Sequence, residues 1–212
     1  MDAKFKKLWD ISKEYLKNGR EVDLPHTRVS LDFALRLIRE EGGDNDVITP
    51  AVILHDIGYS QIQEKDLYKK TTYYSVYAKR KSNEAYSSQL KELHLVEGAR
   101  LARKILESVQ YETHLIDKIV DIVRYHEDVF ARPPSDVKEL NKIIVSDADK
   151  LFRFTPFNFF DIIKIHAASV EEVFQYILDM RDTWLVTKSA QLIAEEEIRK
   201  IPDSYLFSGL FE

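Results

Sequence analysis

Cysteine is absent from all 212 residues of the chain. This absence excludes disulfides, zinc fingers and iron–sulfur clusters bound by thiolates, and it also excludes a thiol nucleophile. Any metal site in the protein must therefore be built from His, Asp, Glu or water.

Long apolar runs are missing as well. No stretch approaches the roughly 20 residues that a membrane-spanning helix needs. The first eight residues, from Met1 to Leu8, lack the apolar core of a signal peptide. We therefore expect a cytoplasmic protein that does not enter a membrane.

The charge balance is acidic, with a formal net charge of −5 and a pI of about 5.8. This balance argues against an extended nucleic-acid surface, although it leaves room for a local basic pocket. Hydrophobic residues make up 44% of the chain and charged residues 32%, which is enough to build a core. The length suits one domain.

Apolar side chains recur at helical spacing along most of the chain, and no strand pattern or internal repeat is evident, so we predict an all-α protein. The expected helices cover residues 2–18, a segment from His26 to Gly42-Gly43, 49–58, 88–108, 112–127, a segment that Asp136 caps and that extends through 147–152, 156–167, 169–182 and 186–200.

The stretch from Thr49 to Tyr59 is central to the interpretation. We expect a short buried helix that Thr49 caps, with Pro50 at its first position and Gly58 in a left-handed conformation past its end. His55 and Asp56 follow four apolar residues. A buried Asp requires a partner. The pair is therefore either a hydrogen bond that stiffens the core or part of a metal site.

The positions of the other histidines favour a metal site. His26 lies at a helix start, His94 on the 88–108 helix and His126 near the end of the 112–127 helix. Helices in a bundle can bring such residues to one centre, and imidazole with carboxylate suits first-row transition metals. Four buried imidazoles without a metal would be costly. His114 and His166 are expected to be structural or exposed.

Two carboxylates, Asp147 and Asp149, lie two residues apart in one predicted helix. Such side chains point about 200° apart, so only one of them can face a given centre. The residues alone do not decide which one.

The ordered set resembles the HD-domain superfamily of metal-dependent phosphohydrolases. His26, then His55-Asp56, then a distal Asp matches the family pattern, and the Ala-Asp-Lys-Leu run at 148–151 assigns Asp149 as that residue. Asp147 is then expected to support the ligands from outside or to lie on the surface. Members with two metals insert two further histidines, which match His94 in its His-x-x-x-Gly-Ala setting and His126.

The resemblance covers residues 24–155 and implies the fold and domain organisation. We expect a single globular HD-domain helical bundle. An N-terminal helix at 1–23 precedes its metal-binding core at 24–155, and C-terminal helices at 156–212 complete the same domain. The Tyr- and Lys-rich segment 60–93 is an insertion in the core, either a solvated loop or a lid or partner surface.

The resemblance also implies how the ligands are shared. His26, His55, Asp56 and Asp149 would hold a first divalent ion, and Asp56, His94 and His126 a second. Asp56 would bridge the two ions and be the catalytic carboxylate. The ions could be Fe, Mn, Ni, Co, Zn or Mg. Together they would polarise a phosphoryl oxygen and activate a water.

The expected activity is hydrolysis of a phosphate ester, with a nucleotide or a small phosphorylated metabolite as substrate. Lys150 and Arg153 either hold the substrate phosphate or form a solvated basic face. The sequence departs from the cyclic-dinucleotide phosphodiesterases of the superfamily, because Glu127-Asp128-Val129 stands where they carry Gly-Tyr-Pro. The alternatives are a di-iron oxygenase of the HD-domain type or a regulatory metal-binding module. Homo-oligomerisation is left open.

Overall fold

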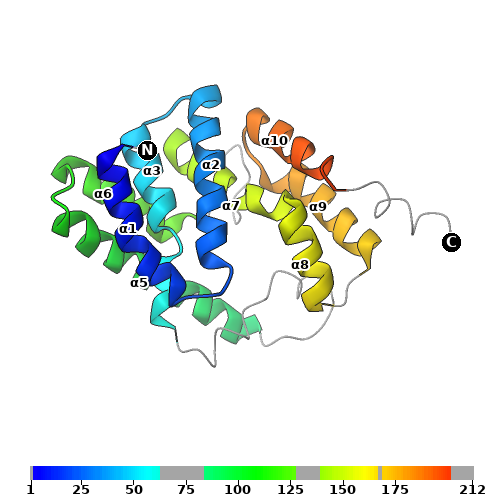
Figure 1. Cartoon of the computed structure of the whole chain (residues 1–212), viewed down its shortest axis with the longest axis horizontal. Helices are drawn as coiled ribbons and strands as arrows, with labels where there is room; N and C mark the ends of the chain where they lie inside the picture. The colour runs from blue at the N-terminus through cyan, green and yellow to red at the C-terminus, as the bar shows by residue number, and fades with distance from the viewer. Residues whose placement is uncertain (1, 63–83, 128–138, 167–168, 202–212) are drawn as a thin grey trace.

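The computed structural model describes residues 2–62, 84–127, 139–166 and 169–201 (Figure 1). All regular secondary structure in these ranges is helical, which confirms the predicted fold class. The α-helices are α1 (Ala3–Lys17), α2 (Asp23–Glu41), α3 (Asn45–Leu54), α5 (Glu84–Ser108), α6 (Thr113–Tyr125), α7 (Leu140–Leu151), α8 (Pro156–His166), α9 (Val170–Trp184) and α10 (Lys188–Ile198). Two 3₁₀ helices, η1 (Ile57–Gln61) and η6 (Phe152–Phe154), follow α3 and α7.

The helices pack around one large hydrophobic core to which each of these α-helices contributes described side chains. α2 lies against α3 and α7, while α5 lies against α6 and η1. In Figure 1, α8, α9 and α10 form a group on one side of α7, and α1, α3, α5 and α6 lie on the other. Within the described ranges, no helix combines the length and the apolar character needed to cross a membrane.

The helix before His55 begins earlier than its sequence predicts. α3 starts at Asn45, and the side chain of Asp44, not Thr49, caps it by accepting a hydrogen bond from the backbone N–H of Asp46. Pro50 therefore lies inside the helix and cannot donate to the carbonyl four residues back. The Tyr111 hydroxyl donates to that carbonyl of Asp46 at 2.7 Å. A distant side chain thus compensates for the proline, which local sequence cannot reveal.

Gly58 also differs from its predicted role. It lies inside η1 and does not have a positive φ, because the glycines with that conformation among the described residues are Gly42 and Gly43. A Cβ at Gly58 would lie 1.9 Å from the backbone oxygen of His94 and 2.6 Å from the backbone nitrogen of Gly98. The glycine is therefore needed for the close approach of η1 to α5, and the expectation of a left-handed cap was wrong.

α7 is tied to the connection between α9 and α10 by Asp147. Its fully buried carboxylate accepts hydrogen bonds from the backbone nitrogens of Val186 (3.0 Å) and Thr187 (2.8 Å), and from the Thr187 hydroxyl (2.8 Å). The alternative that placed Asp147 on the surface was wrong. The predicted capping residue Asp136 lies outside the described residues, and α7 begins at Leu140 after Glu139.

Replacing Thr187 with valine should lower the free energy of unfolding by about 2 kcal/mol. The Thr187 hydroxyl donates to Asp147 and also accepts from the backbone N–H of Ala190 as the N-cap of α10. Losing a cap costs about 1 kcal/mol, and a hydrogen bond to a charged group is worth slightly more. Urea unfolding measures the change. Thr183→Val, at an exposed site on α9, is the matched control and should change stability by less than about 0.5 kcal/mol; equal losses in both would contradict the assignment.

Candidate metal centre

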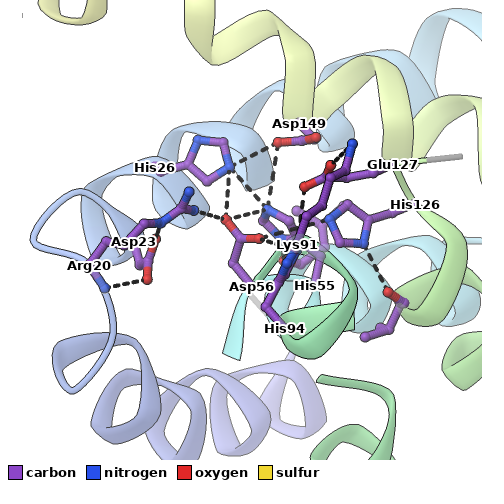
Figure 2. Close-up of polar contacts among 12 residues, drawn as sticks. Arg20, Asp23, His26, His55, Asp56, Lys91, His94, His126, Glu127 and Asp149 are labelled. Atoms are coloured by element: carbon purple, nitrogen blue, oxygen red, sulfur yellow. Dashed lines mark hydrogen bonds and ion pairs between the residues drawn. The ribbon is translucent and has the colours of Figure 1, made fainter. Parts of the chain in front are cut away.

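Four histidines and two aspartates from five helices converge on one buried point (Figure 2). His26 lies in the first turn of α2, His55 and Asp56 follow α3, His94 comes from the middle of α5, His126 follows α6, and Asp149 lies near the end of α7. We call these six residues the candidate metal centre. All of them are buried.

The first half of the centre brings together His26, His55, Asp56 and Asp149. His26 Nε2 lies 3.0 Å from His55 Nε2 and 3.0 Å from Asp149 Oδ1. Asp56 Oδ2 lies 3.5 Å from His26 Nε2 and 3.4 Å from His55 Nε2. Two imidazole nitrogens and two carboxylates therefore face one another at distances that a shared cation would bridge.

The second half of the centre uses the other oxygen of Asp56. Oδ1 lies 3.9 Å from His94 Nε2 and 3.8 Å from His126 Nε2. One ligand atom from each of these three residues lies within 4.8 Å of the others, and the same holds for His26, His55 and Asp56. The Asp56 carboxylate thus stands between two groups of ligand-type atoms, with one oxygen toward each.

Backbone carbonyls orient two of the imidazole rings. His55 Nδ1 lies 2.7 Å from the carbonyl oxygen of Val52, and His126 Nδ1 lies 2.9 Å from that of Val123. A carbonyl only accepts, so each Nδ1 carries a proton, and Nε2 is the nitrogen that faces the centre and can bind a cation when it is deprotonated. A hydrogen bond of this kind on the outer nitrogen is typical of metal-ligating histidines.

His94 has no such hydrogen bond. Its side chain is fully buried, and neither of its ring nitrogens has a hydrogen-bond partner among the residues that the structure describes. A buried imidazole without hydrogen bonds is costly, and a metal ion at Nε2, where Glu127 Oε1 at 3.4 Å is a nearby carboxylate, would remove that cost. The donor set and this unsatisfied ring therefore fit a metal site.

The electrostatics of the centre also attract a cation. Burial alone would raise the pKa of Asp56, but His55 and Arg20 hold it well below its usual range. The pKa of Asp149 is lowered by His26 in the same way against the effect of burial. Burial would lower the pKa of His55, yet the Asp56 and Asp149 carboxylates raise it to about 9. Two ionised carboxylates thus draw positive charge to this position.

Sequence reasoning missed Arg20, which lies in the connection between α1 and α2. Its Nη2 donates to Asp56 Oδ2 at 2.8 Å, and its Nε donates to Asp23 Oδ1 at 2.6 Å. The backbone N–H of Arg20 donates to the other Asp23 oxygen at 2.6 Å. The sequence around Arg20 does not indicate that it contacts the centre, because its partner Asp56 is 36 residues away.

Glu127 and Lys91 were missed as well. Glu127 Oε1 lies 3.4 Å from His94 Nε2, and its other oxygen forms an ion pair with Lys91. Burial would raise the pKa of Glu127, but His94 and Lys91 lower it to about 2. The signal available was spacing, since Lys91 precedes His94 by three residues on α5 and Glu127 directly follows His126.

Lys150 and Arg153 are buried rather than solvated, so the alternative of a solvated basic face was wrong. Lys150 Nζ donates to the carbonyl oxygen of Trp184 at 2.7 Å, and burial lowers its pKa to about 8. The Arg153 guanidinium carbon lies 5.6 Å from the centre of the Trp184 ring. Both side chains contact the end of α9, and a role in holding phosphate stays a prediction.

Two further histidines and the 60–93 insertion were also considered in the sequence. His114 is exposed, in agreement with the sequence analysis. The side chain of His166 and most of the 60–93 insertion lie outside the described residues.

Comparison with known proteins gives a family and a fold. A family model described as HD domain matches residues 24–153. The crystal structure of a predicted HD superfamily hydrolase from an uncultured Thermotogales bacterium superimposes with a TM-score of 0.54 and 17% sequence identity, over 92% of this chain and 84% of that chain. The comparison with curated proteins found no match.

Proposed function

This chain belongs to the HD domain family, whose members are generally metal-dependent phosphohydrolases, and we propose that it hydrolyses a phosphate ester at the candidate metal centre. His26, His55, Asp56 and Asp149 would hold one divalent ion. Asp56, His94 and His126 would hold a second.

The observation that carries the proposal is the position of the Asp56 carboxylate. Its Oδ2 faces the Nε2 atoms of His26 and His55, and its Oδ1 faces those of His94 and His126. A carboxylate in this position is suited to bridge two cations. Such a pair of ions, when bound, supplies polarisation of a phosphoryl oxygen and acidification of a water near neutral pH.

The protein's own residues would prepare the centre for that chemistry. The protons that His55 and His126 hold on Nδ1 leave their Nε2 atoms as ligands. Burial of all six side chains keeps bulk water away and strengthens electrostatic interactions. Positioning and electrostatic stabilisation are most of what phosphoryl transfer requires.

The surrounding charges favour an anionic substrate. Arg20 is paired with Asp23, and Lys91 is paired with Glu127, so each of these two cations has a carboxylate outside the centre. Within the centre, only Asp56 and Asp149 are acidic. Two divalent ions would exceed the charge of these two carboxylates, and a phosphoryl group would offset the excess. We infer a small phosphorylated substrate, either a nucleotide or another metabolite.

Removing metal from the purified protein should lower phosphate release by at least about tenfold, and adding Mn²⁺, Co²⁺, Ni²⁺, Zn²⁺ or Mg²⁺ back should restore it. The assay pairs chelator-treated and reconstituted protein with p-nitrophenyl phosphate, its diester and a set of nucleotides. Release of phosphate that does not depend on metal would contradict the proposal. Oxygen uptake by iron-loaded protein, with no phosphate release, would replace it with an oxygenase.

A further inference from the structure

The His94 ring is fully buried, and among the described residues no hydrogen bond orients it, the Glu127 carboxylate lying 3.4 Å from its Nε2. We propose that Tyr59, clamped by Arg20, positions the His94 ring and thereby enables the second ion to bind. This inference rests on the metal centre proposed above. Tyr59 and Arg20 would act through His94 and Asp56, so both are positioning residues.

The Tyr59 ring stacks directly on the His94 ring. The two ring centroids lie 4.1 Å apart, and the planes differ by 6°. Tyr59 is buried in η1, and Gly58 beside it allows η1 to touch the backbone of α5 at His94. A face-to-face neighbour restricts rotation of the imidazole while leaving both nitrogens, which lie in the ring plane, open to a ligand. Stacking would therefore do for His94 what backbone carbonyls do for His55 and His126.

The Arg20 guanidinium covers Tyr59 and reaches the centre at the same time. Its central carbon lies 3.5 Å from the centroid of the Tyr59 ring, within the range of a cation–π contact. The same group donates to Asp56 Oδ2, as Figure 2 shows. One side chain thus connects the carboxylate proposed to bridge the ions with the aromatic ring that holds His94.

Arg20 is itself held in place by Asp23. The Asp23 carboxylate is fully buried and accepts from both the backbone N–H and the Nε of Arg20. Gly19 leaves room for this carboxylate, since a Cβ there would lie 2.3 Å from Asp23 Oδ2 and displace it. The guanidinium therefore contacts two carboxylates and a ring face at once, which a lysine ammonium could not do.

The test measures metal binding directly. Metal-free wild type, Tyr59→Leu and Tyr59→Phe are titrated with Mn²⁺ by calorimetry, and bound metal is counted by mass spectrometry after gel filtration. We expect two ions in the wild type and in Tyr59→Phe, which keeps the ring face. In Tyr59→Leu we expect one of the two binding events to lose affinity by about 10–100-fold, the usual effect of removing a residue that orients a ligand, while the other event is unchanged.

Arg20→Lys provides a second variant that leaves Tyr59 in place. Lysine keeps the positive charge but lacks the planar guanidinium that contacts Asp56, Asp23 and Tyr59 together. Because both ions share Asp56, we expect each ion to bind about tenfold more weakly. Circular dichroism and thermal unfolding show whether each variant is folded.

Several results would overturn the inference. Tyr59→Leu that binds both ions as the wild type does would show that stacking does not position His94, and equal loss of both ions would indicate a general packing role. If the wild type binds only one ion, His94 has no second ion to bind, and the inference is wrong. Two bound ions, one of them lost in Tyr59→Leu, without phosphate release from any ester would remove the proposed activity but keep the positioning role.

Discussion

Asp56→Ala should bind neither ion with measurable affinity and should release phosphate about a thousandfold more slowly than the wild type. Asp56 is the residue that both halves of the candidate metal centre share, with Oδ2 in one half and Oδ1 in the other. Metal ions typically supply several kcal/mol of transition-state stabilisation, and about 4 kcal/mol corresponds to a thousandfold change in rate. Metal counting and the phosphate-release assay measure the two effects.

The variant should remain folded, which allows the result to be interpreted. Asp23 still pairs with Arg20 after the substitution, so the guanidinium does not lose every carboxylate. Asp32→Ala is a matched control, because Asp32 is exposed on α2 and lies outside the centre. Full activity in Asp56→Ala would refute the proposed centre, whereas equal loss in Asp32→Ala would show that the assay reports something other than the site.

Gly58→Ala should lower the free energy of unfolding by at least about 3 kcal/mol, or about 10 °C in Tm for a chain of this size. The new Cβ would meet the backbone oxygen of His94 at 1.9 Å and the backbone nitrogen of Gly98 at 2.6 Å. Backbone atoms cannot move aside as a flexible side chain can, so η1 and α5 must separate. The separation would carry His94 away from Asp56, and we therefore expect weaker metal binding as well.

Gly98→Ala offers a control on the other side of the same contact. A Cβ at Gly98 would lie 3.5 Å from its nearest neighbours, the His55 oxygen and a Val123 methyl, which is ordinary contact. Because Gly98 is inside a helix, alanine should be neutral or stabilise by about 0.5–1 kcal/mol. Thermal and urea unfolding of both variants test the pair, and similar stabilities would show that η1 and α5 are not packed this closely.

The sequence predicts most of the helices because their apolar side chains recur at helical spacing. This spacing can be recognised within each segment, without knowledge of its tertiary contacts. The resemblance to the HD-domain family also predicts the six residues of the centre as one set, which no single segment does alone. Asp149 was distinguished from Asp147 by the same pattern, and the structure brings Asp149 to within 3.0 Å of His26.

Features that depend on distant partners could not be predicted in this way. Thr49 looks like a cap, but Asp44 is the cap, and Pro50 is tolerated because Tyr111 reaches the carbonyl of Asp46. The sequence predicts that Asp147 lies on the surface or supports the ligands from outside. Its partners, the backbone N–H groups of Val186 and Thr187, are about 40 residues away, so no local pattern indicates them. Arg20 has no motif at all, since its contacts with Asp56 and Tyr59 arise only after the helices assemble.

The hydrogen bonds of α7 reach beyond the segment that matches the family. The family match ends at residue 153. Within it, Asp147 depends on donors at 186–187 and Lys150 on the carbonyl of Trp184, both in the C-terminal third. A fragment cut at the family boundary would keep all six residues of the centre but would remove the hydrogen-bond partners at 184–187 that Asp147 and Lys150 have on either side of Asp149. The end of α9 and its connection to α10 contribute none of the six residues of the centre, yet they supply the hydrogen bonds that anchor α7 on either side of Asp149.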